Sequence, residues 1–137
     1  MKILLTLFVL LFAIPAYSSD DLTGNKIVCS KVDGELIYLT GFKFIGNFDV
    51  IHYQVTNRMP LQKKRVKYET SPEKIMIETN TITEYHINRK NLSITRNNVM
   101  FRNDNFQYEN GECRLHDASI QDFLSKKLEK YKEGNLL

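Results

Sequence analysis

Apolar and polar residues alternate along most of the chain between residues 26 and 115, with the period of two that half-buried β-strands show. In the stretch 48–56, for example, Ile51, Tyr53 and Val55 share one face of the expected strand. Turn-forming Gly, Asn, Asp and Pro residues separate these stretches. The strands that the pattern predicts cover residues 26–30, 35–45, 48–56, 62–70, 75–77, 81–87, 92–94, 99–101, 106–108 and 113–115.

The period changes near the C-terminus, where apolar residues recur with helical spacing. The residues that share this expected face are Ile120, Phe123, Leu124, Leu128 and Tyr131. The pattern predicts an amphipathic helix over residues 117–133, followed by a short tail over residues 134–137. Asp117 or Ser119 can cap the start of this helix.

The first 18 residues have the composition of an export signal. Lys2 precedes an apolar stretch over residues 3–14, and the small residues Ala16 and Ser18 occupy the −3 and −1 positions of a cleavage site. The apolar stretch is shorter than the roughly 20 residues that a membrane-spanning helix needs. We therefore expect a signal peptide over residues 1–18, a secreted or periplasmic mature protein, and no transmembrane anchor after cleavage.

Two cysteines in an exported chain predict a disulfide bond, because the compartments outside the cytoplasm are oxidising. Cys29 and Cys113 would close a loop of 84 residues, since 113 − 29 = 84. A free buried thiol and a metal ligand are the alternatives. Two lone thiols without a paired Cys-x-x-Cys motif make a poor zinc site, so we expect no bound metal.

Many short strands separated by turns predict a mainly β domain over residues 19–116. We expect an antiparallel up-and-down β-barrel, with a strongly curved sheet or a sandwich as the alternative. Closing a barrel brings its first and last strands together, and a Cys29–Cys113 bond would tie those two strands. The amphipathic helix would then pack on the outer wall of the barrel or at its mouth.

The segment Leu22-Thr23-Gly24-Asn25-Lys26-Ile27 resembles the start of lipocalin-like (calycin) domains, in which a glycine is followed by a tryptophan at the base of the barrel. This chain contains no tryptophan, so it matches the glycine of that motif only. The hairpin sequence of residues 87–92 is similar to a turn found in small exported bacterial proteins of uncharacterised function. The first resemblance implies a barrel, and neither resemblance implies an activity.

Composition and motifs narrow the class of function. The net charge of +3 is spread thinly over the chain, so we expect no nucleic-acid partner. The sequence contains no Gly-x-Ser-x-Gly motif, no P-loop and no dinucleotide-binding fingerprint. We therefore expect a protein that acts by binding, without catalysis and without a cofactor.

Three tyrosines are the candidates for a ligand site inside the barrel. Tyr53, Tyr68 and Tyr85 fall on the expected inward faces of three strands. They would line a cavity for an apolar small molecule and orient it with their hydroxyl groups. The alternative is a filled core in which these hydroxyl groups find backbone partners.

The densest basic cluster, Lys63-Lys64-Arg65, is the candidate for a partner-binding site. As a protruding loop, it would engage the catalytic carboxylates of a cell-wall or envelope hydrolase, and the protein would be an inhibitor. The alternative is a charged strand edge that prevents aggregation, in a structural envelope protein without a pocket. We place His52 and His86 on outward faces, where they would not bind a metal.

Overall fold

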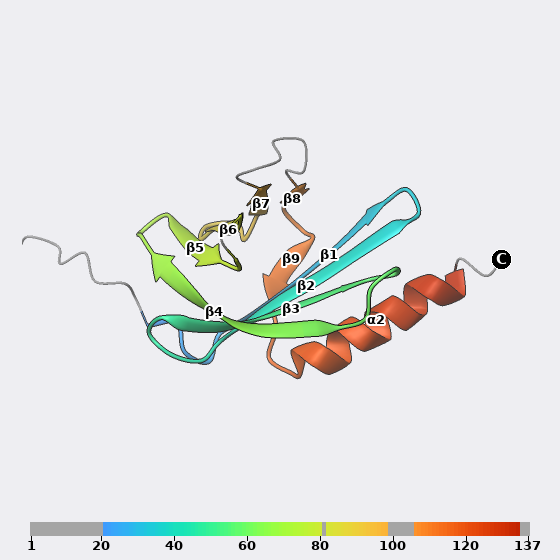
Figure 1. The fold of residues 1–137 in the computed structure, drawn as a ribbon, viewed down its shortest axis with the longest axis horizontal. Helices are drawn as coiled ribbons and strands as arrows, with labels where there is room; N and C mark the ends of the chain where they lie inside the picture. Colours follow the sequence, from blue (N-terminus) through green and yellow to red (C-terminus); the bar gives the residue numbers. More distant parts are fainter. Residues whose placement is uncertain (1–20, 81, 99–105, 135–137) are drawn as a thin grey trace, which may run out of the picture.

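A computed structural model describes residues 21–80, 82–98 and 106–134 of the chain (Figure 1). The elements are β1 (Lys26–Asp33), β2 (Leu36–Phe44), β3 (Asp49–Thr56), β4 (Gln62–Thr70), β5 (Lys74–Glu78), β6 (Thr83–Asn88), β7 (Ile94–Asn98), β8 (Phe106–Tyr108), β9 (Cys113–Leu115) and α2 (Ile120–Gly134). The expected signal peptide over residues 1–18 and the strand expected at 99–101 lie outside the described residues. No helix among the described residues is long and apolar enough to cross a membrane.

The nine strands form one antiparallel sheet in the order β8-β7-β6-β5-β4-β3-β2-β1-β9. Each of the first seven strands pairs with the next one along the chain, and the last strand returns to pair with the first. The sheet curls into a nearly closed barrel (Figure 1), and the predicted fold class is confirmed. Residues 109–112 of the chain connect its two edge strands, β8 and β9.

Most strands begin and end close to the predicted positions because turn residues separate them. The exception is β7, which covers Ile94–Asn98 in place of the predicted residues 92–94. The tightest turn is the two-residue connection between β1 and β2, where Asp33 pairs with Leu36 and Gly34 adopts a φ of 61°. Glycine takes this left-handed conformation without the steric cost that a side chain adds. Gly34 and Glu35 are thus the two residues of this turn.

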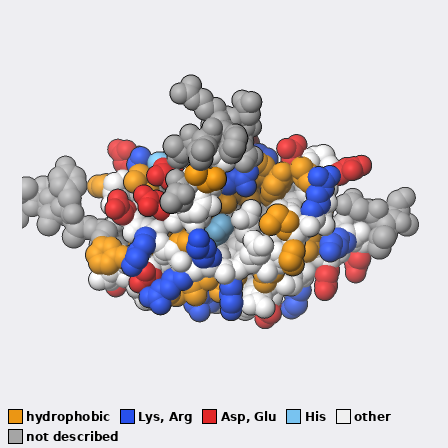
Figure 2. Space-filling view, in the orientation of Figure 1, with side chains coloured by type: hydrophobic (Ala, Val, Ile, Leu, Met, Phe, Trp, Pro, Cys, Tyr) orange, Lys and Arg blue, Asp and Glu red, His pale blue; other side chains and the backbone are white. Residues whose placement is uncertain are grey.

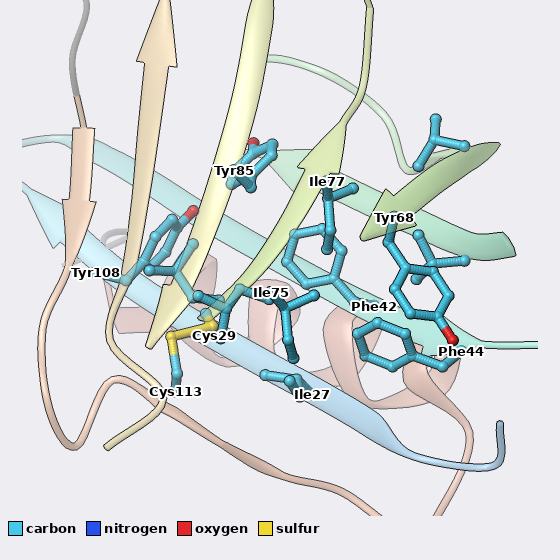
Figure 3. Close-up of a cluster of buried hydrophobic side chains, with 14 residues drawn as sticks. Ile27, Cys29, Phe42, Phe44, Tyr68, Ile75, Ile77, Tyr85, Tyr108 and Cys113 are labelled. Atoms are coloured by element: carbon cyan, nitrogen blue, oxygen red, sulfur yellow. A yellow bond between two sulfur atoms is a disulfide. The ribbon is translucent and has the colours of Figure 1, made fainter. Parts of the chain in front are cut away.

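The interior of the barrel is a filled apolar core (Figure 3). Its rings pack edge to face: the centroids of Phe44 and Tyr68 lie 4.9 Å apart, and those of Phe42 and Tyr85 lie 5.3 Å apart. The buried residues of this core are Ile27, Cys29, Phe42, Phe44, Val50, Val66, Tyr68, Ile75, Ile77, Tyr85, Ile87, Ile94, Tyr108 and Cys113. They come from every strand, so the core joins the whole wall.

A second apolar cluster lies on the outer face, where α2 packs against β2 and β3. Its buried residues are Val28, Ile37, Leu39, Tyr53, Val55, Ile120 and Leu124. The predicted helix is confirmed, and it begins at Ile120 because the Ser119 hydroxyl accepts the Asp122 amide at 3.3 Å.

The prediction that Tyr53 points into the barrel is wrong. Tyr53 lies in the outer cluster with Val55 and packs under α2. Both faces of β3 are buried, one by the core and one by the helix, so the apolar face of the sequence pattern is not the inner face here. The inner face of β3 carries Val50 and His52 instead.

A disulfide between Cys29 and Cys113 ties β9 to β1, as predicted. The two residues are directly opposite in the ladder, with their Cα atoms 4.0 Å apart. Backbone bonds flank them: the Ser30 amide donates to the Glu112 carbonyl and the His116 amide to the Lys26 carbonyl, each at 2.9 Å. A three-residue strand is thus held by a covalent bond as well as by hydrogen bonds.

We expect replacement of both cysteines by serine to lower the free energy of unfolding by up to about 4 kcal/mol, because the bond restricts an 84-residue loop in the unfolded chain. Urea unfolding of the oxidised protein and of the double variant measures this difference.

The non-reduced protein should also be about 2 Da lighter than the reduced form, since two hydrogens are lost. Equal masses would refute the bond.

Gly41 of β2 lies under the first turn of α2, and a Cβ atom at this position would overlap the Cγ2 atom of Ile120. We expect Gly41→Ala to lower the free energy of unfolding by about 1–3 kcal/mol, because the helix must move away from the sheet. Adding Ile120→Ala removes the obstructing atom. In urea unfolding, the double variant should therefore lose less free energy of unfolding than the sum of the losses in the two single variants. Gly46→Ala is the control, since its nearest obstacle is Asp49 Oδ2 at 3.9 Å. Additive effects would contradict the proposed contact.

Candidate functional site

A polar pocket opens in the wall of the barrel beside the first half of β4. The ladder between β4 and β5 begins only at Lys67, opposite Glu78. Residues 62–66 of β4 are therefore paired with β3 alone among the described ladders. The wall is incomplete at this point, and the interior of the barrel becomes accessible from the side. We call this opening the mouth pocket.

The mouth pocket has a volume of about 240 Å³. Its lining residues come from β3, β4, β6, β7 and the connection between β5 and β6. They are His52, Gln54, Gln62, Lys63, Lys64, Thr79, Asn80, Thr83, Tyr85 and Arg96. In Figure 2 the middle of the visible face shows white, hydrophobic and basic groups with one histidine, and most acidic side chains lie near the outline.

Most of the lining residues continue the inner face of the strands beyond the apolar core. Lys64 lies two residues before Val66, Thr83 lies two before Tyr85, and Arg96 lies two after Ile94. Because side chains alternate along a strand, these positions face the same side as the core residues. The inner face of the barrel is therefore apolar at one level and polar at the next.

His52 lies at the boundary between the core and the mouth pocket, and its side chain is buried. Its ring stacks on Phe42 with 4.9 Å between centroids and lies 5.0 Å from the ring of Tyr85. Its Nε2 atom is 2.9 Å from the Thr40 hydroxyl, which itself donates to the Tyr53 carbonyl at 2.9 Å. Since the hydroxyl proton is used in that bond, Nε2 of His52 donates to Thr40.

Burial, together with the positive charge of Arg96, lowers the pKa of His52 to about 4. The imidazole is therefore neutral at physiological pH. His52 therefore contributes an uncharged hydrogen-bonding side chain to the floor of the pocket. The prediction that His52 faces outward is wrong, again because both faces of β3 are buried.

The positive charges of the predicted basic cluster do not act together. The Arg65 guanidinium lies 3.0 Å from a carboxylate oxygen of Asp49, and the Lys67 ammonium lies 3.0 Å from the other oxygen. Lys64, which points to the opposite side of β4, donates to the Thr79 carbonyl at 3.2 Å. Lys63 lies on the rim of the mouth pocket. The cluster is thus part of a strand and not of a protruding loop.

The three predicted ligand-binding tyrosines do not share a cavity. Tyr85 lines the mouth pocket, Tyr53 packs under α2, and Tyr68 lies in the filled core. The Tyr68 hydroxyl donates to the Gly46 carbonyl and accepts the Leu22 amide at 3.3 Å, so it has backbone partners on both sides. Burial raises the pKa of the Tyr68 hydroxyl above its usual value.

Metal binding has no support among the described residues, where no three His, Cys, Asp or Glu side chains come together. His86 is on the outer face and lies 3.2 Å from a carboxylate oxygen of Glu84. His52 and His86 are therefore on opposite faces of the wall.

The sequence pattern did not reveal Gln54, Thr83 and Arg96, nor that Lys64 points inward. Lys64, Thr83 and Arg96 each lie two positions from a core residue on their own strand, and Gln54 lies two positions from the buried His52. The signal was a change from apolar to polar residues along one face. That signal can be recognised only when the inward face of each strand is known.

Comparison of the chain with protein-family models, with curated proteins and with solved structures finds no match.

The buried neutral His52 makes stability depend on pH. Protonation is disfavoured in the folded state, where the pKa is about 4, relative to the unfolded state, where it is 6.5. The contribution of neutral His52 to the free energy of unfolding is fully present above pH 6.5 and is lost as the pH falls towards 4. We expect the free energy of unfolding to fall by about 2 kcal/mol between pH 7.5 and pH 5. The variant His52→Gln should not show this decrease.

Urea unfolding at the two pH values measures this loss for the unmodified protein, for His52→Gln and for His86→Gln. The His86 variant is the matched control, because it removes a histidine from the outer face, and it should keep the pH dependence of the unmodified protein. The same pH dependence in His52→Gln as in the unmodified protein would contradict the assignment.

Proposed function

We propose that the protein is a non-enzymatic binding protein that functions outside the cytoplasm and takes up a small polar ligand in the mouth pocket. The observation that supports the proposal most directly is the polar lining of this pocket above a filled apolar core. Polar side chains inside a barrel cost stability unless they are hydrogen-bonded. A ligand that supplies hydrogen bonds offsets this cost when it binds.

Export is part of the proposal. The disulfide between Cys29 and Cys113 is consistent with an oxidising compartment, and the signal-peptide pattern of residues 1–18 supports the same location.

We also propose a relationship to lipocalin-like proteins at the level of architecture. A nearly closed antiparallel barrel with a helix on its outer wall is compatible with a calycin-like fold. Gly24, in the segment that resembles the start of such domains, has a φ of 91° and donates its amide to the Phe44 carbonyl at 2.9 Å. The chain contains no tryptophan, the residue that follows this glycine in that family.

The ligand that the pocket favours is polar, and not the apolar molecule that we expected from the tyrosines. The alternative function, inhibition of a hydrolase through Lys63, Lys64 and Arg65, requires these residues to project together into a partner. They lie instead on alternate faces of β4, and Asp49 pairs with Arg65. The geometry therefore supports a small-molecule ligand better than a partner protein.

Native mass spectrometry of the protein purified from its own compartment tests this proposal. We expect a co-purifying small molecule that is lost in Gln54→Phe, because the larger side chain fills the pocket. Gln107→Phe is the matched control, since Gln107 is exposed on the outer face of β8, and it should retain the molecule. A stoichiometric partner protein in place of a small molecule would favour the inhibitor, and equal occupancy in the two variants would refute the mouth pocket as the site.

A further inference from the structure

The charges around the mouth pocket are all of one sign. Lys63, Lys64 and Arg96 line it, and none of its described lining residues is acidic. The nearest carboxylate in the β3–β4 ladder belongs to Asp49, which lies on the outer face and pairs there with Arg65 and Lys67. Asp49 and the two cations that pair with it are thus separated from the mouth pocket by the wall of the barrel.

We propose that the mouth pocket is an anion site that binds a small hydroxylated organic acid of about the size of a monosaccharide. This inference rests on the proposed function and adds to it the chemical class of the ligand. The anionic group, a carboxylate or a phosphate, lies between Lys64 and Arg96. The uncharged part of the ligand occupies the space towards Gln54, Asn80 and Thr83.

The position of Lys64 supports the anionic group. Its ammonium nitrogen donates to the Thr79 carbonyl at 3.2 Å, which fixes it at the pocket without neutralising its charge. An ammonium group has three hydrogens to donate, so further donors remain for a ligand oxygen. Arg96 of β7 lines the same pocket as Lys64, and His52 lies directly opposite Lys64 in the ladder between β3 and β4.

The rest of the lining supports the hydroxylated body. Gln54, Gln62 and Asn80 each offer an amide donor and an amide acceptor, and Thr83 offers a hydroxyl group. Neutral His52 and Tyr85 form a floor of rings between them. The pocket volume of about 240 Å³ lies just below the ~300–1,000 Å³ of typical ligand pockets, which suits a ligand as small as a single sugar ring.

The same features favour a small molecule over an acidic side chain of a partner protein. A carboxylate that enters from a partner could pair with the two cations. It would leave the amide and hydroxyl groups deeper in the pocket with water alone. A free sugar acid satisfies both parts of the lining at the same time.

Isothermal titration calorimetry with D-glucuronate, glucose 6-phosphate and neutral D-glucose tests the proposal. We expect at least one of the two acids to bind at least tenfold more tightly than glucose, and to bind more weakly as salt is added. Whether the carboxylate or the phosphate binds better identifies the anionic group. Glucose that binds as tightly as both acids would overturn the anion site and leave the proposed function intact, whereas no binding of any of the three at millimolar concentration would overturn the anion site.

Variants of β4 locate the site. Lys64→Gln should weaken binding of the preferred acid at least fivefold, and Lys64→Arg should restore most of it because the charge returns. Arg65→Gln is the matched control: it removes one positive charge from the next residue, but on the outer face of the strand. Equal weakening by Lys64→Gln and Arg65→Gln would show that only the overall charge matters, and this would overturn the assignment of the pocket.

Discussion

The position of β9 against β1 determines how the whole barrel is closed. This strand is three residues long, and the Cys29–Cys113 bond adds a covalent tie to its hydrogen bonds with β1. The same strand leads directly into α2. The Lys26 side chain also donates to the carbonyl of Ala118, at 3.1 Å, just before the helix begins. The covalent tie therefore places the helix on the outer wall, where it covers β2 and β3.

The covering helix explains which parts of the fold could be predicted from the sequence. The period of two identified the strands, and the helical spacing identified α2, because these patterns are local. The inward face of β3 could not be identified in this way. Ile51, Tyr53 and Val55 form the more apolar face of that strand, yet they contact the helix, while His52 faces the interior. When both faces of a strand are buried, no row of polar residues marks a solvent-exposed face, so the sequence does not show which face points inward.

The mouth pocket was missed for a related reason. Lys63, Lys64 and Arg65 look like one basic cluster in the sequence, although successive residues of a strand point to opposite faces. Only Lys64 follows the inner face of β4 towards the core. Arg96 lies far away in the sequence and reaches the same region through the curl of the sheet. Local sequence patterns do not show which side chains of β4 face inward, and they do not show that β7 lies near the mouth pocket.

The two levels of the barrel differ in burial. The apolar level, with Phe42, Phe44 and Tyr68, stabilises the fold. The polar level buries less surface, because Lys64 is exposed and Arg96 is only partly buried, so it contributes less to stability. His52 joins the two levels, since its ring stacks on Phe42 and its hydrogen bond to Thr40 satisfies a buried nitrogen. A polar level beside a filled core is the arrangement that the proposed binding role requires.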